Sequence, residues 1–183
     1  MATTIIIGDG PAGLSAALFL AKNDHEAVVF GQDDTAMHWA LLKNYLGIDE
    51  QPGSEFQERA KDQVKQFGAD LRDEEVTEVR RDADGFVVTT AGGGQERGDY
   101  LVLAAGKAGG QLAEQLDIEA GPDGVAHDTE YRTSVDRVYA IGRLARPNRS
   151  QAIVSAGAGA TAALDILSRE AGEDVHDWDS PDD

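Results

Sequence analysis

The strongest constraint on the fold is a glycine-rich turn, Gly8-Asp9-Gly10-Pro11-Ala12-Gly13, between a strand-like and a helix-like segment. β-branched residues dominate Thr3 to Ile7, which predicts a strand buried on both faces. Apolar residues recur at helical spacing from Pro11 to Lys22, and Ala27 to Phe30 predicts a second buried strand. A Gly-x-Gly-x-x-Gly turn inside such a βαβ unit predicts a Rossmann-type dinucleotide-binding fold.

Each glycine of this turn has a physical role in that fold. Gly8 allows the tight turn, Gly10 lets the main chain approach a pyrophosphate, and Gly13 lets helix and strand pack closely. The helix then presents free N–H groups and a partial positive charge to the diphosphate. We therefore expect phosphate contacts from the turn, while a glycine turn without a ligand remains the alternative.

One feature of dinucleotide-binding folds is absent. The acidic residue that binds a ribose hydroxyl at the end of the second strand is replaced by Gly31-Gln32, with Asp33 and Asp34 just beyond. This replacement leaves the identity of the dinucleotide open.

The next segment combines an irregular stretch with a helix. From Thr35 to Pro52 the pattern is irregular, and we expect an ordered excursion with one helical turn. A helix is predicted from Ser54 to about Phe67, with Ser54 and Gln57 as a capping box and Gly68 as its stop.

The second half of the chain predicts a β-meander followed by further buried elements. Strand-like stretches at Glu75 to Arg81, Phe86 to Thr90 and Gln95 to Gly98 are separated by glycine-containing turns, which predicts a small antiparallel meander. Further elements are expected as buried strands at 100–103 and 137–141 and a small-residue helix at 151–167. We expect one α/β domain over residues 1–170, with a central parallel sheet and its C-terminal helix packed on it, and a flexible acidic tail at 171–183.

The charge balance restricts the partners. The chain has 34 acidic and 16 basic residues, a formal net charge of -18, and the acidic residues are spread along its length. Such a field repels nucleic acid and anionic lipid. We interpret it as solvation in a halophilic cytoplasm, with an ordinary acidic protein as the alternative.

Several classes of protein and site are excluded by residues or segments that the sequence lacks. There is no cysteine, which rules out disulfides, thiolate metal sites and a Cys-x-x-Cys couple within the chain. Its histidines show no metal-ligand spacing, so no metal site is predicted. The sequence also has neither the apolar run of a membrane-spanning helix nor the basic start of a signal peptide, and we expect a cytoplasmic location.

Several motifs together resemble the thioredoxin-reductase-like, pyridine nucleotide-disulfide oxidoreductase family. The turn with proline after its second glycine resembles the FAD-binding turn of that family. Further matches follow in the family's order: 44–48 with 52–56, Leu101-Val102-Leu103-Ala104-Ala105-Gly106, 132–142, and Gln151-Ala152 with the helix after it. The resemblance covers about Thr3 to Leu167 and implies a flavin domain.

By this resemblance the chain binds FAD through the turn and through residues near its matched motifs. The implied cofactor contacts are Gly8, Gly10, Pro11, Ala12, Gly13, Gln32, His38, Asn44, Val76, Ala105, Gly106, Gly142, Arg143, Gln151 and Ala152. Catalytic residues are not identified.

The chain departs from the family in two ways. Members insert a pyridine-nucleotide domain, which carries the redox cysteines, where this chain has only Lys107 to Arg132. Arg143 stands where the family has an aspartate near the ribityl chain and the diphosphate. That arginine either pairs with phosphate oxygens or fills the site and excludes flavin. Together with Arg146 and Arg149, it contacts an anion or pairs with surface carboxylates.

His38, Trp39 and Tyr45 each have two interpretations, a role beside the flavin or an ordinary structural place. By resemblance His38 and Trp39 lie beside the isoalloxazine ring, where an aromatic or a histidine tunes the flavin potential. The alternative is packed aromatic side chains and a solvated histidine.

The sequence thus predicts an FAD-binding oxidoreductase domain that receives electrons from free NAD(P)H, a ferredoxin or another redox partner protein. A homodimer or a partner is expected over the flavin face that the missing domain would leave uncovered. The alternatives are a degenerate, non-catalytic nucleotide-binding or partner subunit, and an NAD(P)-binding domain without flavin.

Overall fold

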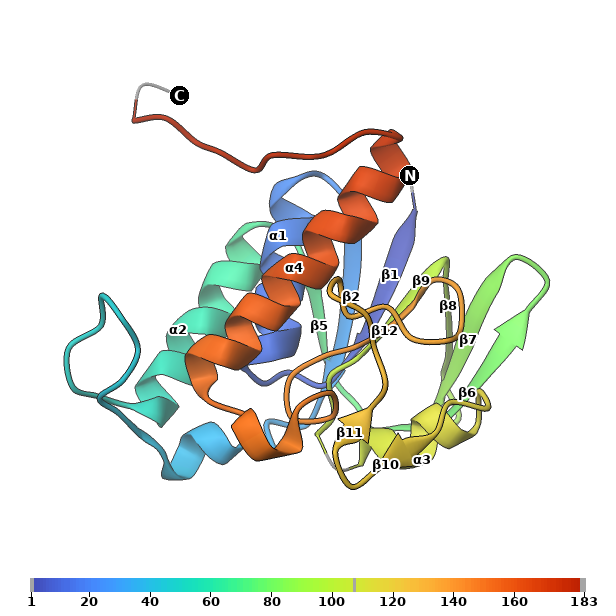
Figure 1. Cartoon of the computed structure of the whole chain (residues 1–183), viewed down its shortest axis with the longest axis horizontal. Helices are drawn as coiled ribbons and strands as arrows, with labels where there is room; N and C mark the ends of the chain where they lie inside the picture. The colour runs from blue at the N-terminus through green and yellow to red at the C-terminus, as the bar shows by residue number, and fades with distance from the viewer. Residues whose placement is uncertain (1, 107, 182–183) are drawn as a thin grey trace.

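A five-stranded parallel sheet organises the molecule in the computed structural model, which describes residues 2–106 and 108–181 (Figure 1). Its strand order is β12-β9-β1-β2-β5. The strands are β1 (Thr3–Ile7), β2 (Glu26–Gly31), β5 (Asp70–Asp73), β9 (Tyr100–Leu103) and β12 (Val138–Ala140). Ile7 pairs in register with Phe30 on one side and with Leu103 on the other, so the carboxyl ends of three strands meet at one edge.

Two layers cover the sheet. Three helices lie on one side: α1 (Pro11–Lys22), α2 (Gly53–Gln66) and α4 (Ala152–Ala171) (Figure 1). The other side packs against an antiparallel sheet of β6 (Val76–Asp82), β7 (Gly85–Thr90) and β8 (Gln95–Gly98), and against α3 (Gly109–Glu114). Alternate residues of β1 serve the two layers, because Ile6 belongs to the helix-side core and Ile5 and Ile7 to the opposite one.

Short elements complete the chain. They are η1 (Ala36–Trp39), β3 (Leu41–Leu42), β4 (Gln51–Pro52), β10 (Ala120–Gly121), β11 (Gly124–Val125) and η2 (Pro147–Arg149). No helix among the described residues combines the length and hydropathy needed to cross a bilayer.

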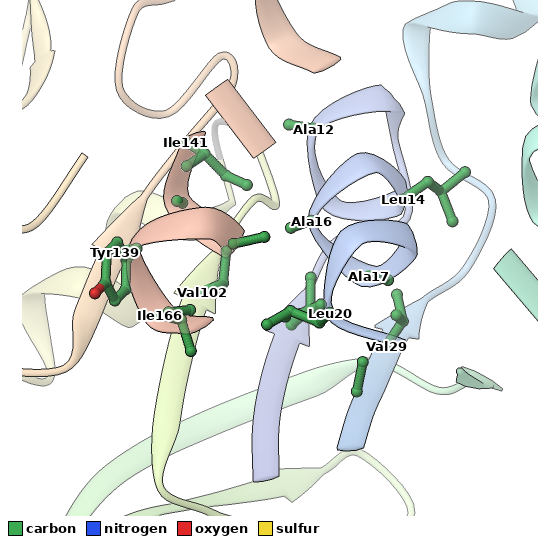
Figure 2. Packing of buried hydrophobic residues seen from close by; sticks show 14 of the residues in the cluster. Ala12, Leu14, Ala16, Ala17, Leu20, Val29, Val102, Tyr139, Ile141 and Ile166 are labelled. Carbon is green, nitrogen blue, oxygen red and sulfur yellow. The ribbon is translucent and has the colours of Figure 1, made fainter. Parts of the chain in front are cut away.

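Helices α1 and α4 cross in very close contact. A Cβ on Gly159 would lie 2.1 Å from the carbonyl oxygen of Ala12 and 2.9 Å from the amide nitrogen of Ala16. Figure 2 shows Ala12 and Ala16 turned toward α4. Ile166 and Leu20 belong to the same buried cluster and lie further along the two helices. Small residues therefore set the distance between the helices, and α1 carries the glycine turn at its start.

The predicted Rossmann-type sheet, the antiparallel meander and the small-residue helix are confirmed. The predicted capping box is wrong, because α2 begins at Gly53 with Pro52 at its cap, and no side chain caps it. Gln57 is instead buried and donates to the carbonyl oxygen of Asp9. Strand β5 and helix α3 were not predicted.

The C-terminal segment folds back toward α1. Lys22 forms ion pairs with Asp177 and Asp179, and Val175 packs against the helix-side core. The boundary at residue 170 and the flexibility of the tail stay predictions.

Two glycines of α4 provide a matched test of the helix crossing. We expect Gly159→Ala to destabilise the fold by about 1–3 kcal/mol, because its methyl group must push α1 away. Gly157→Ala, with nothing within 4 Å of its Cβ, should instead gain up to about 1 kcal/mol of helix stability. Urea unfolding of both variants checks this, and equal effects would contradict the close crossing.

Candidate dinucleotide-binding site

The glycine turn is packed tightly on the sheet at two of its three glycines. Gly8 has φ +115°, and a Cβ there would lie 2.6 Å from the carbonyl carbon of Ala104. A Cβ on Gly13 would lie 1.9 Å from the carbonyl oxygen of Gly8. These two glycines are therefore required by the fold itself, whatever the turn binds.

Gly10 differs, because its surroundings leave room. Its backbone is extended, with φ -76° and ψ -177°, which any residue adopts. The nearest atom to a Cβ there is Thr35 Oγ1, at 3.4 Å. Packing does not require a glycine at this position, whereas close approach of a ligand to the main chain would require one.

Gly10 is also the N-cap of α1, and no side chain caps this helix. The first N–H groups of a helix have no partner within it, so those of Ala12 and Gly13 are available at the turn. Together with the helix dipole they give the start of α1, called the cradle below, a partial positive charge of the kind that favours an anion.

Other predicted cofactor residues gather at the same edge of the sheet. Ala105 and Gly106 follow β9, and Gly142 and Arg143 follow β12. A Cβ on Gly142 would lie 2.9 Å from the Cβ of Ala12, and Arg143 Cδ lies 4.0 Å from the corresponding point on Gly106. Segments far apart in sequence thus converge on the start of α1.

A hydrogen bond joins two further predicted positions. Asn44 Nδ2 donates to Gln151 Oε1 at 3.0 Å, which links the irregular excursion to the start of α4, where Ala152 is the first helical residue. Gln32 is exposed directly after β2, and Val76 is buried at the start of β6. The structure therefore brings the excursion and the start of α4 together, while the cofactor contacts predicted for these residues stay predictions.

A charged network that the sequence did not reveal borders the turn. Lys61 of α2 forms ion pairs with Asp9 Oδ2 at 2.9 Å and Asp33 Oδ1 at 2.6 Å. Asp9 Oδ2 also accepts the N–H of Asp33 at 3.1 Å, and His38 Nε2 lies 3.0 Å from Asp33 Oδ2. Gln57 belongs to the same network, and its buried Oε1 has no hydrogen-bond partner. Lys61 lies one helical turn after Gln57, which is the only sequence signal that connects them.

The ion pairs shift the titration of both partners. Burial alone would raise the pKa of the Asp33 carboxyl, but hydrogen bonding and attraction from Lys61 hold that pKa below its ordinary value. Burial likewise opposes the charge on Lys61, yet its contacts with Asp33 and Asp9 raise the pKa of the ammonium above its usual range.

The three arginines after β12 form no ion pair with the residues that the structure describes. Among the described residues, no salt bridge involves Arg143, Arg146 or Arg149. The interpretation that these arginines pair with surface carboxylates is therefore wrong for the described residues. Arg146 and Arg149 line a cavity of about 450 Å³ beside β11.

The aromatic residues of the excursion have different environments. Trp39 is 80% exposed, so it is not the packed side chain of the alternative interpretation. Tyr45 does pack, with its ring centroid 5.4 Å from that of Phe56. His38 is engaged with Asp33 rather than free in solvent.

A larger cavity of about 630 Å³ lies between α1, α2 and the loop before β4. Of the predicted cofactor residues, only Pro11 lines it. It borders the turn at Pro11, and its other lining residues lie outside the predicted cofactor set.

The parallel sheet, the helices that cover it and the glycine turn define a Rossmann-type fold. Comparison with protein families is more specific: residues 46–160 match the pyridine nucleotide-disulphide oxidoreductase model. The chain belongs to this family.

Curated relatives agree with this family. The thioredoxin reductase of Listeria monocytogenes is 29% identical over 67% of this chain and 39% of its own length. The ferredoxin–NADP reductase of Ignicoccus hospitalis is 28% identical over 60% of this chain and 38% of its own. The chain thus spans well under half the length of these relatives.

Solved structures share the fold. A thioredoxin reductase from Gloeobacter violaceus superposes with a TM-score of 0.85 at 20% identity, covering 97% of this chain and 99% of that chain. The atypical thioredoxin reductase TRi from Desulfovibrio vulgaris Hildenborough gives 0.84 at 20% identity, covering 94% and 99%. At this identity they show the fold alone.

Substitution of Lys61 tests the network. We expect Lys61→Met to cost about 1–2 kcal/mol at pH 7, because it leaves two carboxylates without their cation while the half-exposed Asp33 is partly screened by water. The lowered pKa of Asp33 contributes stability above its unfolded pKa, about 3.9, and that stability is lost as pH falls through the folded value. The cost of the variant should therefore shrink below about pH 4.

Lys65→Met is the matched control, because Lys65 lies one turn further along α2, is exposed and forms no ion pair with any described residue. Denaturant unfolding of both variants at neutral and acid pH makes the comparison. A pH-independent cost for Lys61→Met would mean that the methylene stem, and not the charge, carries the stability.

Proposed function

We propose that this chain binds FAD with its diphosphate on the cradle at Gly10 and acts as the flavin domain of an oxidoreductase. The observation that carries this proposal is the uncapped start of α1 beside a glycine that packing does not require. Membership of the pyridine nucleotide-disulphide oxidoreductase family supports FAD over other dinucleotides.

The residues at the edge of the sheet divide the work of binding. The N–H groups of Ala12 and Gly13 hold phosphate oxygens. The guanidinium of Arg143, which has no ion pair within the described part of the chain, adds positive charge close to Gly106. The Asn44–Gln151 hydrogen bond fixes the excursion against α4, so that both line the place of the flavin ring. Bound FAD supplies hydride and single-electron transfer, which no side chain of this chain provides.

The electron donor and acceptor come from outside this domain. Only segment 107–132 connects β9 with the region before β12, where the family inserts its pyridine-nucleotide domain. The chain also has no cysteine and cannot pass electrons through its own dithiol. We therefore propose free NAD(P)H, a ferredoxin or another redox protein as partners, and a second copy or a partner over the flavin face.

The net charge of -18 supports our proposal of a halophilic cytoplasm as the working environment. Binding experiments therefore belong at high salt, where repulsion between the acidic residues is screened.

Substitution of Gly10 tests FAD binding. The wild-type protein, loaded with FAD and desalted at high salt, should show the flavin absorption bands. We expect Gly10→Ala to weaken FAD binding at least about tenfold, since its methyl group occupies the approach of the diphosphate. The apo protein should melt within about 3 °C of the wild type, because the backbone at Gly10 accepts alanine.

Gly157→Ala serves as the control, since it adds the same methyl group in open space on α4. Fluorescence titration of FAD into the three apo proteins gives the affinities. A colourless wild type that takes up no FAD would favour the non-catalytic subunit instead.

A further inference from the structure

The end of β2 lacks an acidic side chain, but a carboxylate occupies the space above it. A Cβ on Gly31 would lie 2.3 Å from Cγ and 2.5 Å from Oδ1 of Asp9. Dinucleotide-binding folds place an acid at the end of this strand to bind a ribose hydroxyl. Here the acid reaches that place from the glycine turn, and the missing side chain of residue 31 makes room for it.

The Asp9 carboxylate is held in a fixed orientation. Its Oδ2 accepts the N–H of Asp33 and pairs with Lys61, and its side chain is 11% exposed. Oδ1 makes no hydrogen bond or ion pair with the described residues. One oxygen thus anchors the group, while the other, above Gly31, retains its capacity to accept.

The network around Asp9 has more acceptors than donors. Gln57 is 1% exposed, and its Oε1 is buried without a partner, although its Nε2 donates to the carbonyl oxygen of Asp9. Buried acceptors are rarely left unpaired in native proteins. A ligand that brings a hydroxyl donor complements such a site, whereas one that brings a further anion does not.

We propose that Asp9 Oδ1 accepts a hydrogen bond from the 2′-hydroxyl of the adenosine ribose. This inference rests on the proposed FAD binding and assigns the recognition of its adenosine half. With two carboxylates, Asp9 and Asp33, against one ammonium, Lys61, the site carries a net negative charge and disfavours a ribose with a 2′-phosphate.

Nucleotide titrations of the apo protein test the assignment without flavin chemistry. The probes are ADP, 2′-deoxy-ADP and 2′-phospho-ADP, with FAD measured in parallel. We expect the wild type to bind ADP at least about tenfold more tightly than either analogue, as one charge-assisted hydrogen bond implies. In Asp9→Gly the preference over 2′-deoxy-ADP should fall to within about twofold.

A paired substitution provides the control. Gly31→Glu alone should lower the melting temperature and nucleotide affinity, because its Cβ collides with Asp9. Asp9→Gly with Gly31→Glu removes the collision and returns the acid to the strand, so the preference for ADP should reappear. Asp9→Asn keeps the shape of the side chain and should reduce the preference for ADP over 2′-deoxy-ADP about threefold. This variant tests the assignment even if the paired variant does not fold.

The outcomes separate this inference from the proposed function. If the wild type takes up FAD but binds ADP and 2′-deoxy-ADP equally, the ribose assignment is wrong and flavin binding stands. If it prefers ADP but takes up no FAD, the flavin proposal fails and the ribose contact stands. If Asp9→Gly binds ADP more tightly with no change in preference, Asp9 hinders nucleotide binding and the ribose assignment is wrong. A wild type that binds neither ADP nor FAD overturns both the ribose assignment and the flavin proposal.

Discussion

The site depends on how closely the main chain at the start of α1 approaches the sheet. Gly8 and Gly13 leave no space for a Cβ, and on the other side Gly159 of α4 admits none against Ala12. Helix α1 is thus fixed between the strand ends and α4, and its first N–H groups are aimed by packing rather than by side-chain caps. Because these contacts are steric, they fix the direction of these N–H groups without any charged residue.

The apolar pattern predicted the central strands well and failed where a strand is polar. Strands β1, β2 and β9 are short apolar runs covered on both faces, which is the pattern that identifies parallel strands. Strand β5 reads Asp-Leu-Arg-Asp and lies at the edge, where it pairs with β2 and places Arg72 over the Phe30 ring at 5.4 Å. Its conformation comes from a neighbour distant in sequence, which local periodicity does not report.

The site shows the same division between local and tertiary information. The turn glycines were predictable because their spacing fixes their roles within one βαβ unit. Gln57 was misassigned to a cap because Ser54 and Gln57 have the capping-box spacing, whereas the fold uses this amide to hold the carbonyl of Asp9. Asp9, Asp33 and Lys61 come from three segments, and the vacancy at Gly31 gives the Asp9 carboxylate its position.

The net charge of -18 is compatible with the proposed binding of a dinucleotide. At about 0.1 M salt the Debye length is about 10 Å, so distant carboxylates contribute little to the potential at the cradle. Close to the turn lie the N–H groups of α1, Arg143, which has no ion pair with the described residues, and the carboxylates of Asp9 and Asp33, which Lys61 partly neutralises. The N–H groups of α1 and Arg143 lie at the start of the helix, whereas the Asp9 carboxylate, although it belongs to the turn, lies above Gly31 at the end of β2. In the proposed complex the diphosphate would meet the positive groups and the neutral ribose would meet Asp9.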